Sequence, residues 1–400
     1  MNKLFLIIGI VLILISSFFW YKYSLDKAIE IKHPEWKNYT LDNESARRFV
    51  DVVYDSQNNP HIFYYAELTK EGIKHVYSNN TLEDYYKNDR RWNSELLKGG
   101  KDTGFFISAA ALKDTLYISF QDYAIADEKL LLAINDSITI IDSKEKSGLN
   151  AGMYSSVCLA NGKPYVLYHV EEGRKLMLAD PQQNLHLLET GTGWNIDCIS
   201  DNKSIFVGYR GRDDMNLRLG TFNIESEEWS SKRFQVNASS IALFFWNNSP
   251  YVVYYDHDDK GIYLSEFYEF NPRRIADGSE TLLRAATSNN QAYILYSHYW
   301  SGLYLLNSSN LIDFDKTVVA SGPDIGLFNA LAVTPNDDIK IAYVEDNSLK
   351  FKEYERSSYL YMMNKKMESI KKDKMLGSIT ALVGILFIIF GVKQWKKEKS

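Results

Sequence analysis

Arginine, histidine, acidic and aromatic residues stand directly after several short tyrosine-rich segments, where they could recognise a ligand together. Mixed aromatic, arginine and acidic side chains are typical of binding surfaces. Arg210 is the leading candidate, because it follows Tyr209 at a position where other segments carry uncharged residues. Its alternative role is a structural ion pair with Asp213 or Asp214. The candidate binding residues are Gln121, Asp122, His169, Glu171, Trp194, Arg210, Arg212, Tyr255, Asp256, His257, Tyr299 and Trp300.

The sequence contains no recognisable motif for catalysis or for binding a metal or cofactor. Residues 99–103 (Gly-Gly-Lys-Asp-Thr) lack the glycine spacing of a phosphate-binding loop. Neither Gly-x-Ser-x-Gly nor His-Glu-x-x-His occurs. The acidic run at 256–261 could hold a cation through its carboxylates, but a solvated hairpin tip explains it better. We therefore expect no catalytic residue, metal or cofactor, and a non-enzymatic role is favoured.

Charge and cysteine content narrow the class of protein further. The net charge is −6 over 400 residues, so no basic field indicates a nucleic-acid partner. Two cysteines rule out a disulfide-based scaffold. Cys158 and Cys198 occupy matching positions in adjacent repeats and could form a disulfide in an oxidising compartment. Two buried thiols are the favoured alternative.

A β-rich unit recurs about every 46 residues along most of the chain. Each copy contains a short strand that ends in an aromatic residue, with a strand of small and aliphatic residues before it and an alternating strand after it. Four antiparallel strands in each of seven units predict an all-β, seven-bladed β-propeller. The seven aromatic-ended segments are 60–64, 116–120, 164–168, 205–209, 250–254, 292–296 and 339–343.

The last unit lacks a fourth strand, and residues 35–42 resemble the fourth-strand segment 228–233. We therefore expect an N-terminal strand to complete the blade that begins at Phe328 and to remove its free edge. The chain would then enter and leave the propeller on the face that carries the turns between first and second strands. We call this the terminal face and expect it to lie toward the membrane. The opposite face, the free face, would be available for binding.

Two apolar segments flank the repeats, at 4–20 and 375–392. Both are long enough, or nearly so, to cross a bilayer. The first lacks a small-residue cleavage site, which favours an uncleaved signal-anchor over a cleaved signal peptide. The lysine-rich C-terminal tail favours the cytoplasm, which would place the propeller on the extracytoplasmic side (periplasmic, extracellular or lumenal). Gly377, Ala381 and Gly384 could permit close helix packing, although such residues are also ordinary in membrane helices.

These observations divide the chain into six segments. Tyr359, Met363, Met367 and Ile370 have helical spacing and predict an amphipathic helix beside the membrane, with a plain extension of the second span as the alternative. The expected boundaries are 1–21 for the N-terminal anchor, 22–34 for a linker, 35–355 for the propeller, 356–374 for the amphipathic helix, 375–393 for the second span and 394–400 for the tail.

Segments 161–168 (Asn-Gly-Lys-Pro-Tyr-Val-Leu-Tyr) and 248–256 resemble blades of the sialidase-like, BNR-type propeller superfamily. The resemblance covers about residues 35–355 and implies the fold. The chain lacks the Ser-x-Asp-x-Gly-x-x-Trp Asp-box and the Arg-Ile-Pro motif of true sialidases. The resemblance therefore does not imply sialidase activity.

The sequence favours a membrane-anchored module that binds or assembles proteins or glycans through the free face. A carbohydrate-active hydrolase or lyase is the first alternative, and it would need carboxylates or arginines that converge on the axis. The inner strands are mostly apolar, with Asp51, Asp197 and Arg284 as exceptions. A structural subunit of a larger membrane complex is the second alternative.

Overall fold

The computed structural model describes residues 2–28, 35–43, 46–67, 71–87, 90–124, 127–278, 282–289, 291–323 and 325–398. The chain divides into two units: a helical unit of residues 1–35, 82–89 and 355–400, and a β-unit of residues 36–81 and 90–354. The segment 82–89 belongs to the helical unit, which the sequence did not predict. Each unit is described by itself.

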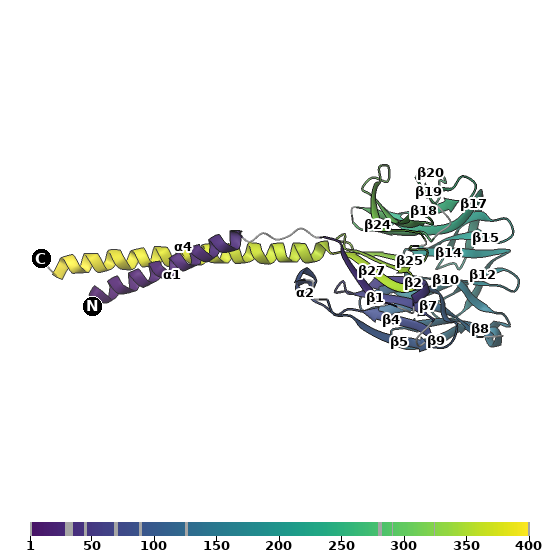
Figure 1. The fold of residues 1–400 in the computed structure, drawn as a ribbon, viewed down its shortest axis with the longest axis horizontal. Coiled ribbons are helices and arrows are strands. Elements are labelled where there is room, and N and C mark those ends of the chain that lie inside the picture. Colours follow the sequence, from purple (N-terminus) through teal and green to yellow (C-terminus); the bar gives the residue numbers. More distant parts are fainter. Residues whose placement is uncertain are drawn as a thin grey trace. The chain divides into compact units, whose positions relative to one another are not determined.

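The β-unit contains five four-stranded sheets and one seven-stranded sheet, all antiparallel (Figure 1). The seven-stranded sheet consists of two four-stranded halves that share the long strand β17. Its strands are β14 (Thr192–Ser200), β15 (Ser204–Gly211), β16 (Asn216–Asn223), β17 (Trp229–Trp246), β18 (Ser249–Asp256), β19 (Gly261–Glu266) and β20 (Arg273–Asp277).

Four of the four-stranded sheets join consecutive strands in up-and-down order, and the fifth takes its outer strand, β1, from the N-terminal part of the chain. One sheet contains β2 (Ala46–Tyr54), β3 (Pro60–Ala66), β4 (Gly72–Tyr77) and β5 (Asn93–Gly99). The next contains β6 (Thr103–Leu112), β7 (Thr115–Ala124), β8 (Asp127–Ile134) and β9 (Ser137–Asp142). A third contains β10 (Ala151–Ala160), β11 (Lys163–Val170), β12 (Lys175–Ala179) and β13 (Leu185–Thr190). A fourth sheet contains β21 (Arg284–Thr287), β22 (Ala292–His298), β23 (Gly302–Ser308) and β24 (Asp315–Ser321). The fifth contains β25 (Asn329–Val333), β26 (Ile339–Glu345), β27 (Ser348–Tyr354) and β1 (Lys37–Asp42). A short helix, α3 (Lys144–Ser147), links β9 to β10.

The core lies between neighbouring sheets, because the second strand of each sheet is buried on both faces. The largest buried side chains include an aromatic residue two positions before the end of such strands, as at Tyr64, Tyr168 and Tyr209. Hydrophobic clusters pack each sheet against the next, and one cluster combines residues of β2–β4 with residues of β25–β27.

Three of these tyrosines make the same hydrogen bond to the preceding sheet. The hydroxyl group of Tyr168 donates to Asp142 at the end of β9, at 2.7 Å, and Tyr209 donates to Glu189 at the end of β13. Tyr64 donates to Asp42 at the end of β1, at 2.5 Å. The N-terminal strand β1, which pairs with β27, therefore contacts β3 as other fourth strands contact the sheet that follows them.

A buried ion pair reinforces the contact between these first and last sheets. Arg90 lies 2.6 Å from Glu353 of β27, and both side chains are fully buried. The guanidinium group also lies over the rings of Trp92 and Tyr39, with 4.9 Å and 5.9 Å to the ring centroids. A buried charge is tolerated when it is paired in this way, and the loss of one partner is strongly destabilising.

The helical unit contains α1 (Asn2–Ala28), α2 (Leu82–Lys87) and α4 (Arg356–Glu398). α1 and α4 pack antiparallel, and both are long and apolar enough to span a membrane. A Cβ atom on Gly384 would lie 3.1 Å from the carbonyl oxygen of Gly9, so glycine permits this close approach. Ser16 donates to the carbonyl of Gly377 at 2.7 Å, and Lys22 pairs with the buried Asp373 at 3.1 Å.

Two expectations for the helices need correction. Residues 356–398 form one continuous helix, so the structure agrees with the plain extension of the second span and not with a separate amphipathic helix over 356–374. α1 continues to Ala28, beyond the expected boundary at 21. Lys365 of α4 also pairs with Glu83 of α2 at 2.6 Å.

Replacement of Tyr64 by phenylalanine should destabilise the β-unit by about 1–3 kcal/mol, because it leaves the Asp42 carboxylate without its buried hydroxyl partner. Tyr254→Phe is the matched control, since the described residues offer its hydroxyl group no hydrogen bond. The measurement is urea unfolding of the full chain in detergent, followed by tryptophan fluorescence. Equal losses in the two variants would contradict a specific role for the Tyr64–Asp42 contact.

Candidate functional site

The structure divides the predicted binding residues into separate groups. Tyr299 and Trp300 lie at the tip of the β22–β23 hairpin, where Trp300 is 74% exposed. Asp122 accepts a hydrogen bond from Thr103 at 2.7 Å, and Asp256 accepts one from the backbone of Asp258. Four of the predicted residues are buried in the β-unit: Gln121, His169, Arg210 and Tyr255.

One group does come together, on the free face where the β10–β13 and β14–β17 sheets meet. Arg212 pairs with Glu171, and its guanidinium group lies 5.1 Å from the centre of the Trp194 ring. Glu171 also lies 3.2 Å from Nε2 of His169. Tyr154, which the sequence did not single out, has its ring 6.0 Å from that of Trp194. We call Tyr154, His169, Glu171, Trp194, Arg210 and Arg212 the aromatic–arginine cluster.

The cluster has a defined charge pattern. Burial lowers the pKa of His169, so its imidazole is neutral near pH 7. Burial alone would raise the pKa of Glu171, but hydrogen bonds from Arg212 and His169 hold it below its ordinary value. Gly193, at φ +110°, lets the backbone approach His169, since a Cβ atom there would lie 2.7 Å from Nδ1. The cluster thus presents a carboxylate, arginines and two aromatic rings.

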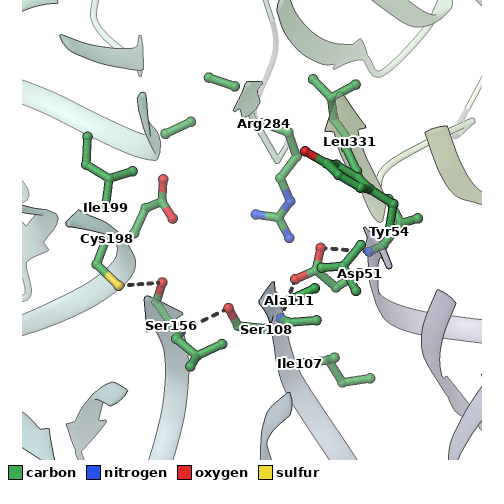
Figure 2. Close-up of a pocket in the computed structure, with 18 of the residues that line it drawn as sticks. Asp51, Tyr54, Ile107, Ser108, Ala111, Ser156, Cys198, Ile199, Arg284 and Leu331 are labelled. Carbon is green, nitrogen blue, oxygen red and sulfur yellow. Dashed lines mark hydrogen bonds between the residues drawn. The ribbon is translucent and has the colours of Figure 1, made fainter. Parts of the chain in front are cut away.

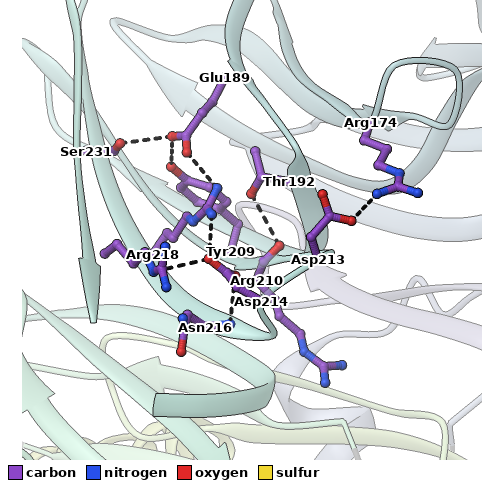
Figure 3. A network of polar contacts seen from close by, with 11 residues as sticks. Arg174, Glu189, Thr192, Tyr209, Arg210, Asp213, Asp214, Asn216, Arg218 and Ser231 are labelled. Carbon is purple, nitrogen blue, oxygen red and sulfur yellow. Dashed lines mark hydrogen bonds and ion pairs between the residues drawn. The ribbon is translucent and has the colours of Figure 1, made fainter. Parts of the chain in front are cut away.

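The backbone of Arg210 pairs with Trp194, which places Arg210 beside this cluster. The two acids proposed as its alternative partners bind other cations: Asp213 pairs with Arg174, and Asp214 pairs with Arg218 at 2.8 Å (Figure 3). Figure 3 shows the Arg210 side chain directed away from Asp214. Both Arg210 and Arg212 interact with Tyr154 electrostatically.

Cys158 and Cys198 are both buried free thiols in this structure. The disulfide considered from the sequence remains a prediction for an oxidising compartment. Burial and the neighbouring Cys158 thiol raise the pKa of Cys198 well above its ordinary value. Cys198 therefore lacks the lowered pKa of a nucleophilic thiol.

A cavity of about 600 Å³ lies between the first strands of the sheets. Part of its polar lining comes from one structural position that recurs in several sheets. At this position, a residue of the first strand pairs with the residue just before the buried aromatic residue of the second strand. This position holds Asp51, Ser108, Ser156, Asp197 and Arg284 (Figure 2). The sequence marked the charged members only as exceptions among apolar residues.

The two aspartates connect neighbouring sheets. Asp51 accepts a hydrogen bond from the backbone N–H of Ala109 at 2.7 Å, and Asp197 accepts one from Leu243 at 2.7 Å. Ser108 accepts the equivalent bond from Val157 at 3.1 Å. Burial raises the pKa of both aspartates, that of Asp197 to about 6, and Arg284 opposes the rise.

A smaller cavity of about 210 Å³ lies nearer the free face and shares Arg284 with the larger one. Its rim includes Phe49, Phe106, Tyr154 and Asn195, which come from β-bulges in four successive first strands and have φ between 49° and 52°. Such φ values are strained for bulky residues. Bulges of this kind redirect side chains and are common beside functional sites.

Asp197→Asn should change how stability depends on pH. Since burial raises the pKa of Asp197 from 3.8 to about 6, its stabilising contribution is present below about pH 4 and is lost as the pH rises through 6. Asparagine does not titrate and keeps an acceptor for the Leu243 N–H. We expect the unfolding free energy of the variant relative to wild type to rise by on the order of 2 kcal/mol between pH 4 and pH 7.

Urea unfolding of the full chain at pH 4, 5, 6 and 7 measures this difference. Asp136→Asn, at an exposed turn between β8 and β9, is the matched control and should show no such trend. A difference between Asp197→Asn and wild type that stays constant with pH would contradict the raised pKa.

Comparisons with known proteins identify the fold of the β-unit. No protein-family profile matches the sequence, and no curated protein sequence matches it. The lectin BP39L from Burkholderia pseudomallei is similar in structure, with a TM-score of 0.55, 12% identity and coverage of 80% of this chain and 97% of the lectin. A catalytically inactive virginiamycin B lyase from Staphylococcus aureus, in complex with quinupristin, is also similar, with a TM-score of 0.52 and 9% identity. The match covers 80% of this chain and 99% of the lyase.

A Trypanosoma rangeli sialidase mutant displaying trans-sialidase activity is also similar, with a TM-score of 0.47 and 10% identity. The match covers 86% of this chain and 62% of the sialidase. At these identities the likeness concerns the fold alone. The predicted resemblance to sialidase-like propellers is confirmed only as a similarity of fold, and the β-unit shares its fold with the BP39L lectin and the virginiamycin B lyase.

Proposed function

We propose that this chain is a membrane-anchored, seven-bladed β-propeller that binds glycans through the aromatic–arginine cluster on its free face. The blade number is supported by five four-stranded sheets and by a seven-stranded sheet that divides at β17 into two halves. Closure of the ring is supported by the pairing of β1 with β27 and by the cluster that packs the first sheet against the last. The Tyr64–Asp42 contact repeats those of Tyr168 and Tyr209.

Anchoring is supported by α1 and α4, which have apolar stretches at Ile7–Leu25 and Arg356–Phe390. Because the two helices are antiparallel, both chain ends would lie on one side of the bilayer. The lysines after Val392 favour the cytoplasm for that side, and the propeller would then be extracytoplasmic. Within the β-unit, the chain enters at Lys37 and leaves near Glu353, which are paired residues on the terminal face. The free face carries neither connection.

The observation that carries the binding proposal is the position of Arg212 between the Trp194 ring and Glu171. Aromatic faces pack against the apolar faces of sugar rings, and charged groups form strong hydrogen bonds with hydroxyl groups. The lectin neighbour agrees with this assignment at the level of fold. A protein partner is the alternative ligand, and the exposed Trp300 would then be the expected anchor.

The hydrolase or lyase alternative depends on Asp51 and Asp197, the carboxylates that line the cavity. Both accept hydrogen bonds from backbone N–H groups of the next sheet, which gives them a structural role. This observation favours binding over catalysis.

Trp194→Ala and Arg212→Ala should each weaken glycan binding by at least about tenfold, because each removes a central contact of the cluster. The measurement is a glycan array with the full chain in detergent, followed by calorimetry with the best glycan. Arg174→Ala, an exposed arginine whose ion pair with Asp213 lies outside the cluster, is the control. Absence of glycan binding by wild type, together with a copurifying protein that Trp300→Ala releases, would overturn the glycan assignment.

The membrane topology predicts that a cysteine at Trp300 reacts with a membrane-impermeant maleimide in intact cells, whereas a cysteine at Glu398 reacts only after lysis. Background labelling should be low, because Cys158 and Cys198 are buried. The protein should also stay in the membrane fraction after alkaline carbonate extraction. Release by carbonate, or labelling of position 398 in intact cells, would contradict this topology.

A further inference from the structure

The charges that line the larger cavity do not pair with one another. Asp51, Asp197 and Arg284 occupy equivalent positions in three sheets. Within the part of the chain that the structure describes, Arg284 forms no ion pair or hydrogen bond, and its Nε atom is buried without a partner. Figure 2 shows its guanidinium group directed into the cavity. Arg284 interacts with Asp51 and Asp197 only electrostatically, so its guanidinium group keeps hydrogen-bond donors that a ligand in the cavity could use.

The charge pattern restricts what that ligand can be. Two carboxylates and one guanidinium group line the middle of the cavity, while Asp55 and Lys113 at its mouth add one charge of each sign. A simple anion would be repelled by the two aspartates, and a simple cation would be repelled by Arg284. A molecule with one positive and one negative group matches both kinds of charge.

The remaining lining agrees with a small molecule. The volume of about 600 Å³ lies within the range of small-ligand pockets. The walls between the charged residues are aliphatic, from Ile107, Val157, Ile199, Leu331 and Val333. Backbone N–H groups hold the carboxylates of Asp51 and Asp197 in fixed positions, so the acceptors are preorganised for a ligand.

We propose that this cavity is a second binding site, distinct from the aromatic–arginine cluster, which takes a small zwitterion. Its ammonium group would lie against Asp51 and Asp197, and its carboxylate would bind Arg284. The charged residues converge only when the sheets are assembled, so the site belongs to the folded β-unit.

The test uses calorimetry on the full chain in detergent with a series of ω-amino acids: glycine, β-alanine, 4-aminobutyrate, 5-aminopentanoate and 6-aminohexanoate. Butylamine and butyrate are the single-charge controls. We expect one chain length to bind best and to bind at least about tenfold more tightly than either single-charge control. The best length also measures the separation between the carboxylates and Arg284.

Two variants assign the contacts. Arg284→Gln should abolish the advantage of the best amino acid over butylamine, and Asp197→Asn should reduce its advantage over butyrate. Arg284→Lys keeps the charge and should retain part of the affinity, which separates loss of binding from loss of folding. Arg174→Gln, an exposed arginine outside the cavity, should leave binding unchanged.

Three outcomes would overturn the proposal. These are equal binding of butyrate and the amino acids, binding that Arg284→Gln does not affect in a folded variant, and no binding by any member of the series. Glycan binding through the aromatic–arginine cluster is measured separately, so failure of one site leaves the other assignment intact.

Discussion

The β-unit depends on hydrogen bonds and ion pairs that join neighbouring sheets, above all those that join the first sheet to the last. β1 pairs with β27 across most of the chain, and Lys350 reaches Thr40 over a separation of 310 residues. Antiparallel pairing satisfies backbone groups that would otherwise form an exposed edge. The buried ion pair between Arg90 and Glu353 stabilises the same contact between the first and last sheets, because loss of either partner would leave the other charge buried and unpaired. The contact between the first and last sheets also holds the cavity together, because the cavity is lined by first strands from different sheets.

The same need explains why polar residues line an otherwise apolar axis. Small side chains suit the crowded first strands, but backbone N–H groups of the adjacent strand still require acceptors. Asp51, Ser108 and Asp197 provide them at one recurrent position. Arg284 occupies that position in a later sheet and makes no equivalent bond among the described residues. It therefore departs from the structural pattern, which is the reason to assign it to a ligand.

The period-two pattern of the strands was readable from the sequence, and so was the aromatic end of each second strand. The sequence did not show whether the residue after that aromatic residue is buried or exposed. Successive side chains alternate between the two faces of a strand, and both faces of these strands are buried between sheets. Gln121 and His169, expected on the free face, are buried for this reason. The axial charges come from sheets far apart in sequence. The positions of Asp51 and Asp197 depend on bulges that shift the register by one residue, whereas Arg284 occupies the equivalent position without such a shift. No local pattern encodes those shifts.

The bulges also connect the two sites. Tyr154 is a bulge residue with φ 52°, and its ring contacts Trp194 of the aromatic–arginine cluster while it lines the smaller cavity above Arg284. A bulky residue in this conformation is strained, and such strain persists only where surrounding contacts hold it. Four successive first strands keep the same conformation, which is more than closure of the sheets requires, since β21 and β25 pair without a register shift. Among the described first strands, these positive φ values occur in the four that contribute Phe49, Phe106, Tyr154 and Asn195 to the rim of the smaller cavity.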